Sequence, residues 1–155
     1  MHIDMASAEA QLHSALEAKK IDDAAEIAWS TIWLEACGYT GLKFLAEALA
    51  DERQSRPLTR DVLGIDLDNV SAGFLAPGIV SEVKANGRAF LRNVRHGLFL
   101  LPYSVREGLG IGCPVDPSFA VGGERHKNPY GEKLEQAARD GLELDDALWA
   151  QVTSG

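Results

Sequence analysis

The sequence predicts an α+β protein: a helical N-terminal lobe of about three helices packed on a small antiparallel sheet, then a long Gly/Pro-rich arm and C-terminal helices. Apolar residues recur at helical spacing near both ends of the chain, and short apolar runs bounded by turn residues lie between them. The length of 155 residues is that of one ordinary domain. We therefore expect a single domain, 1–155, made of a helical part (1–55), a strand and loop part (61–128) and C-terminal helices (129–155).

Three helices are expected in the N-terminal part. The first covers 5–16, with Asp4 in position to cap its start. The second covers 21–36, where apolar residues follow the i, i+3, i+4, i+7 pattern, and Gly38 ends it. A third helix is expected after Thr40. Trp29 and Trp33 are one turn apart in the second helix, and this spacing favours core packing over a ligand platform.

The middle of the chain predicts strands less clearly. The segment 53–60 has no apolar periodicity and reads as a connector. Asn86-Gly87 is compatible with a tight turn between strands at 79–85 and 88–94, or with the end of a helix over 79–85. The apolar run 97–101, followed by a proline, predicts a buried strand.

The segment 102–131 contains six glycines and four prolines, so we expect an irregular arm there. Pro129 is expected to open a helix over 130–140 that ends at Gly141. A last short helix is expected over 144–152, with acidic residues at its start.

Composition excludes several classes of protein. The net charge of −8 argues against binding to nucleic acid or to an anionic membrane, and the sequence has no apolar run long enough for a transmembrane helix. The first residues do not resemble a secretory signal, so we expect a cytoplasmic protein. Cys37 and Cys113 are then expected to be reduced thiols, with Cys37 a small buried or capping residue.

One stretch departs from this acidic character. Between Val83 and Arg106 there are five basic residues and no acidic one. They are Lys84, Arg88, Arg92, Arg95 and Arg106. Either these side chains pair with carboxylates elsewhere in the fold, or they form a pocket for an anionic group.

The candidate site residues lie in this stretch and in the arm. Arg92, Arg95 and Arg125 are of the type that clamps a carboxylate or phosphate, and Asp116 and His126 would complete the ligand site. Cys113 is a candidate nucleophile, with His96 or His126 as its base.

Cofactor motifs are weak. The Gly-x-Gly-x-Gly run at 108–112 is followed by prolines instead of a helix, so it matches no nucleotide loop, and the cofactor stays unknown. Cys113, Asp116, His96 and His126 do not have the spacing of a usual zinc site, so no metal is expected.

Two segments carry a family resemblance. The sequences AAEIAWSTIWLEACGYTGLKFLAEAL (24–49) and VRHGLFLLPYSVR (94–106) resemble the uncharacterised bacterial DUF3726 proteins. The resemblance covers part of the chain and implies a soluble bacterial protein. It assigns no activity and carries over no catalytic residue.

Two functional hypotheses follow. The first is an interaction or accessory protein, or a small subunit, that forms a homo- or hetero-oligomer. The Trp-bearing helix, the arm 102–131 and the terminal Trp149 helix would be its interface elements, with Tyr103, Phe119 and Tyr130 as aromatic anchors. The alternative is an enzyme or binding protein for an anionic metabolite that uses Arg92, Arg95 and Arg125 with His96 and Cys113. The sequence favours the first hypothesis slightly, because the arm carries no recognisable catalytic motif.

Overall fold

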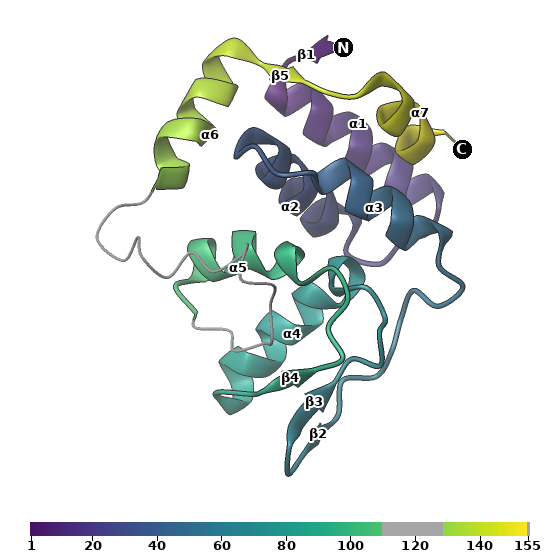
Figure 1. The fold of residues 1–155 in the computed structure, drawn as a ribbon, viewed down its shortest axis with the longest axis vertical. Helices are drawn as coiled ribbons and strands as arrows, with labels where there is room; N and C mark the ends of the chain where they lie inside the picture. The colour runs from purple at the N-terminus through teal and green to yellow at the C-terminus, as the bar shows by residue number, and fades with distance from the viewer. Residues whose placement is uncertain (110–128, 155) are drawn as a thin grey trace. The chain divides into compact units, whose positions relative to one another are not determined.

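The computed structural model describes residues 1–109 and 129–154, and it has an α+β fold (Figure 1). The chain forms two compact units. Met1–Leu49 and Val121–Gly155 make up the first, here called the terminal unit, and Ala50–Ala120 makes up the second, here called the middle unit. The expectation of a single domain stays a prediction.

The terminal unit is mainly helical. Its elements are β1 (His2–Ile3), α1 (Met5–Ala18), α2 (Ala24–Ala36), α3 (Gly41–Ala50), α6 (Pro129–Asp140), β5 (Leu142–Glu143) and α7 (Asp146–Thr153). The predicted cap of α1 is confirmed, because Asp4 accepts a hydrogen bond from the Ser7 amide. At the start of α7, Asp145 accepts a hydrogen bond from the Leu148 amide. Gly38 and Gly141 have positive φ angles of 87° and 82° just after α2 and α6, as their positions predicted.

Apolar side chains from α1 and α2 form the core of this unit, with Leu12, Leu16, Ile27 and Ile32 fully buried. The ring of Trp33 packs against that of Tyr130 from α6, with centroids 5.1 Å apart. Trp33 is therefore a core residue, as its spacing predicted. The two-residue strands β1 and β5 pair antiparallel beside these helices.

The turn from α2 to α3 is held by close packing. A Cβ atom at Gly41 would lie 2.6 Å from the Thr31 carbonyl oxygen and 3.0 Å from Leu34 Cβ, so only glycine fits there. The Glu35 carboxylate accepts a hydrogen bond from the Leu42 amide, one of the free N–H groups at the start of α3. The residues Leu34-Glu35, Gly38 and Gly41 therefore build this corner together.

The middle unit contains a three-stranded sheet. Its elements are β2 (Arg60–Asp61), β3 (Gly64–Asp66), α4 (Ala72–Asn86), β4 (Leu91–Arg92), the 3₁₀ helix η1 (Gly97–Phe99) and α5 (Leu100–Glu107). The strand order is β2-β3-β4, with β2 and β3 antiparallel and β3 and β4 parallel. α4 makes the crossover that a parallel pair requires.

The structure selects the helical alternative at Asn86-Gly87. α4 ends at Asn86, and Gly87 has a φ angle of 82°. The alternative prediction, a hairpin that joins strands at 79–85 and 88–94, is wrong. Within 88–94, strand β4 covers only Leu91–Arg92. Buried residues at 72, 75, 76, 79, 80 and 83 follow helical spacing through Pro77, which the helix accommodates.

The predicted strand at 97–101 is also wrong. Residues 97–99 form η1, and α5 begins at Leu100. A short apolar run fits a buried strand and a buried helix equally well, and Pro102 lies in the first turn of α5, where its missing N–H group would have no partner in the helix. The part of the predicted arm from 102 to 107 is accordingly helical.

Candidate functional site

The parallel strands β3 and β4 continue at their carboxyl ends into two polar loops, 67–71 and 93–96. Backbone hydrogen bonds join the loops side by side: the amides of Leu67, Asn69 and Ala72 donate to the carbonyls of Arg92, Asn93 and Arg95 over 2.8–3.0 Å. In sheets with parallel strands, this edge is where ligands commonly bind. It also holds three of the residues that the sequence singled out: Arg92, Arg95 and His96.

Four residues in these loops adopt left-handed backbone conformations. Asp68, Asn69, Asn93 and His96 have φ angles between 46° and 60°. Side chains other than glycine rarely adopt such angles, although these residue types do so most readily. The cross-loop hydrogen bonds therefore hold a costly backbone geometry in place.

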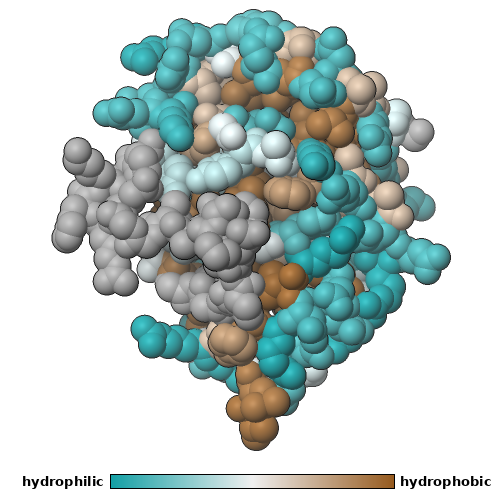
Figure 2. Space-filling view, viewed as in Figure 1, coloured by the Kyte–Doolittle hydropathy of each residue, from teal (hydrophilic) through white to brown (hydrophobic). Residues whose placement is uncertain are grey.

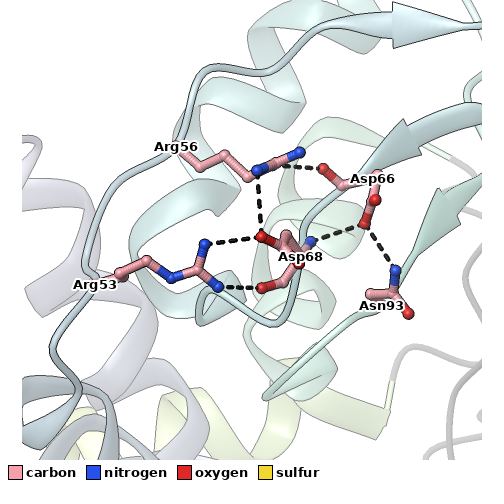
Figure 3. Close-up of polar contacts among 5 residues, drawn as sticks. All are labelled: Arg53, Arg56, Asp66, Asp68 and Asn93. Atoms are coloured by element: carbon pink, nitrogen blue, oxygen red, sulfur yellow. Dashed lines mark hydrogen bonds and ion pairs between the residues drawn. The ribbon is translucent and has the colours of Figure 1, made fainter.

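A polar network braces the first loop (Figure 3). Arg53 donates to the Asp68 carboxylate at 2.8 Å and to its carbonyl at 2.6 Å, and Arg56 donates to the Asp66 carbonyl at 2.9 Å. The Asp66 carboxylate accepts from Asn93 Nδ2 and from the Asp68 amide, both at 2.8 Å. These hydrogen bonds hold the pKa of Asp66 below its usual value, so it is a carboxylate at neutral pH.

Arg92 and Arg95 are already paired. Arg92 Nη2 lies 2.6 Å from Asp61 Oδ2, and Arg95 makes a two-pronged contact with Asp51 over 3.1 Å. Lys84 and Arg106 both contact the Glu107 carboxylate. The first interpretation of the basic stretch, internal ion pairing, thus holds for these four residues. An anionic ligand at Arg92 or Arg95 would have to compete with a carboxylate of the chain itself.

His96 contacts a buried serine. Its Nδ1 atom lies 2.8 Å from Ser71 Oγ, and that oxygen also accepts a hydrogen bond from the Gly73 amide as the N-cap of α4. This distance suits a nucleophile and its base. Ser71 has no exposed surface, however, so its hydroxyl serves here to cap the helix and orient the imidazole.

The other predicted site residues, Cys113, Asp116, Arg125 and His126, lie outside the described residues, as does Phe119. Among the described residues no group of three or more His, Cys, Asp or Glu side chains is placed to hold a metal ion. Cys37 is buried, and burial raises the pKa of its thiol to about 11, so the group is protonated and unreactive at neutral pH. Tyr103 and Tyr130, expected as interface anchors, and Trp149 of the expected interface helix are also buried, with exposed fractions of 1%, 6% and 8%.

The turn between β2 and β3 exposes large apolar side chains. Val62 is 100% exposed and Leu63 64% exposed, and Phe90, just before β4, is 53% exposed. A Cβ atom at Gly64 would lie 1.9 Å from the Phe90 carbonyl oxygen. The backbone of Phe90 therefore lies next to Gly64, at the end of the β2–β3 hairpin. We call Val62, Leu63 and Phe90 the apolar tip. Figure 2 shows hydrophobic surface at this end of the hairpin.

Hydrogen bonds and an ion pair from Asp61 and Arg60 fix the turn that carries the apolar tip. The Asp61 carboxylate accepts from the Leu63 amide within the turn. Arg60 pairs with Glu82 of α4 at 2.8 Å and donates to the carbonyl oxygens of Gly87 and Arg88. Because β2 is thus tied to the end of α4, the exposed side chains are presented on a fixed support. This exposed turn was not predicted from the sequence, although Asp61-x-x-Gly64 is a typical turn pattern with Val62 and Leu63 at its centre.

Comparisons with known proteins give no assignment. No family model matches the chain, and neither a curated protein nor a solved structure matches it. The resemblance to the DUF3726 proteins therefore stays a prediction. In the described part of the chain, no helix is both long and apolar enough to cross a membrane.

Proposed function

We propose that this chain is an interaction or accessory protein that joins a homo- or hetero-oligomer through the apolar tip. The observation that carries the proposal is the full exposure of Val62 beside exposed Leu63 and Phe90, on a hairpin fixed by Arg60. Single exposed apolar residues are common, but adjacent ones on an ordered turn are typical of a binding surface. Phe90 is of the aromatic type that is enriched at interfaces, and a partner that covers Val62 and Leu63 would remove their apolar surface from water.

The alternative, binding of an anionic metabolite, has less support in the described residues. Two of its three arginines, Arg92 and Arg95, already have carboxylate partners, and Arg125 lies outside the described residues. The Ser71 hydroxyl beside His96 is fully buried. This function stays a prediction that rests on the sequence.

The proposal is tested by native mass spectrometry of the untagged protein purified gently from its own host. We expect wild type to appear in a complex, and the variant Val62→Ser/Leu63→Ser to appear mainly as the free chain, because serine removes the apolar surface without disturbing the turn. Gln11→Ser/Gln136→Ser, two exposed uncharged positions in the terminal unit, is the control and should behave as wild type.

Two results would contradict the proposal. One is a free monomer for wild type under gentle purification. The other is a complex that survives unchanged in Val62→Ser/Leu63→Ser, because the apolar tip would then play no part in assembly.

A further inference from the structure

We infer that the partner of the apolar tip is a second copy of this chain, which meets the first through the middle unit. The inference rests on the proposed function and names the occupant of its surface. Two observations support it: the net charge differs between the two units, and the surface around the apolar tip carries both positively and negatively charged side chains.

The acidic surplus of the protein lies wholly in one unit. Residues 50–120 contain eight acidic and eight basic residues, whereas the remaining residues contain fifteen acidic and seven basic ones. The terminal unit therefore carries the entire net charge of −8, and the middle unit is neutral. Two copies of an acidic protein repel each other, and contact through the neutral unit brings the least like charge together.

Most charges of the middle unit are also neutralised locally. Asp68 pairs with Arg53 and Arg56, and the other pairs are Arg60–Glu82, Arg92–Asp61, Arg95–Asp51 and Lys84–Glu107. A surface of paired charges around exposed apolar side chains resembles the rim and centre of an ordinary interface. It offers no excess of charge that would select a strongly acidic or strongly basic partner.

The surface around the tip is suited to meet its own copy. In a two-fold dimer the same patch faces itself, so it must hold complementary groups. The exposed Arg88 guanidinium has no carboxylate partner among the described residues, whereas the Asp61 carboxylate is 54% exposed although it pairs with Arg92. With the apolar tips in contact at the centre, Arg88 of each copy can pair with Asp61 of the other.

Side chains, and not strand pairing, would make this contact. β2 and β4 are the two edge strands of the sheet in the described residues, and each has only two residues; both residues of β2 are charged. Short, charged edge strands are poor templates for adding another strand. The dimer is therefore expected to depend on Val62, Leu63 and Phe90, and on Arg88 at the rim.

The test is sedimentation equilibrium of the purified full chain alone, over a wide range of micromolar concentrations. We expect a monomer–dimer equilibrium for wild type. Val62→Ser/Leu63→Ser should raise the dimer Kd by about a hundredfold or more, since each copy loses two buried apolar side chains. Gln11→Ser/Gln136→Ser should leave the Kd unchanged, and circular dichroism confirms that each variant is folded.

A matched pair of charge reversals tests the rim. Arg88→Glu should weaken the dimer by about tenfold, because it places like charge against Asp61 of the second copy. Arg139→Glu makes the same change in charge at an exposed position of the terminal unit and should have a much smaller effect. Equal effects of the two reversals would mean that net charge alone controls association, and would overturn the assignment of Arg88.

Two further outcomes overturn the inference. Either the isolated chain stays monomeric at every concentration, or its dimer is unaffected by Val62→Ser/Leu63→Ser. If the isolated chain is monomeric while the complex from the host still depends on Val62 and Leu63, only the second copy as partner is excluded and the proposed function stands. If the complex from the host is also unchanged in Val62→Ser/Leu63→Ser, both the inference and the proposed function are contradicted.

Discussion

Glu35 shows how one side chain links packing to pH. Burial raises the pKa of its carboxyl, and the hydrogen bond from the Leu42 amide only partly opposes this shift. Between the ordinary value of 4.5 and the raised value, the folded protein holds a proton that the unfolded chain has released. The free energy of unfolding contributed by Glu35 therefore falls as the pH rises through this window.

This linkage predicts the behaviour of Glu35→Gln. The amide keeps an oxygen that accepts from the Leu42 amide but cannot ionise, so the variant should gain stability relative to wild type as the pH rises from about 4.5 to 7. Urea unfolding at several pH values measures this difference. Glu17→Gln, at an exposed position of α1, controls for the loss of one negative charge. Parallel stability curves for wild type and Glu35→Gln would contradict the prediction.

Two carboxylates of the middle unit, Glu82 and Glu107, have lowered pKa values, so their effect on stability depends on pH in the opposite direction from that of Glu35. Hydrogen bonds from Arg60 and Asn86 lower the pKa of Glu82, and Lys84 lowers that of Glu107. Their stabilising effect is lost as the pH falls through the lowered pKa values. Both groups lie in the middle unit, so the acid sensitivity of that unit has a different origin from the effect of Glu35.

At the scale of elements, the corner between α2 and α3 depends on Gly41. The variant Gly41→Ala places a methyl group 2.6 Å from the Thr31 carbonyl oxygen, and we expect it to lower the free energy of unfolding by about 1–3 kcal/mol. Chemical denaturation measures this loss. Lys43→Ala, at an exposed position of the same helix, should change stability by no more than about 0.5 kcal/mol. A Gly41→Ala protein as stable as wild type would show that the two helices can separate at no cost.

The elements also show why some sequence patterns were read correctly and others were not. The helices of the terminal unit have local signals: apolar periodicity, Asp4 and Asp145 as caps, and glycines after their ends. In 72–101 the signals conflict, because Pro77-Gly78 suggests an interruption and 97–101 is too short to separate strand from helix. There the buried environment of Ile79, Val83 and Leu98 decides the conformation.

At the scale of the whole molecule, the uneven charge predicts a salt effect. Repulsion among the acidic residues of the terminal unit should destabilise the fold at low ionic strength. Raising NaCl from about 0.01 M to 0.15 M shortens the Debye length from about 30 Å to 8 Å and should raise the Tm. The variant Asp22→Lys/Glu132→Lys, at two exposed positions, should show a smaller rise. Differential scanning calorimetry measures both, and an equal or larger rise in the variant would contradict the prediction.

The sequence by itself determined the α+β class, the helices at both ends and the basic character of the segment that carries Arg92, Arg95 and His96. Each of these follows from local information: periodicity, capping residues or composition. The tertiary structure decided the partners of those side chains, because Asp61, Asp51 and Ser71 lie 31, 44 and 25 residues away along the chain. It likewise decided that the tip formed by Val62 and Leu63 is exposed while Tyr103 is buried, because burial depends on which elements fold back over a residue.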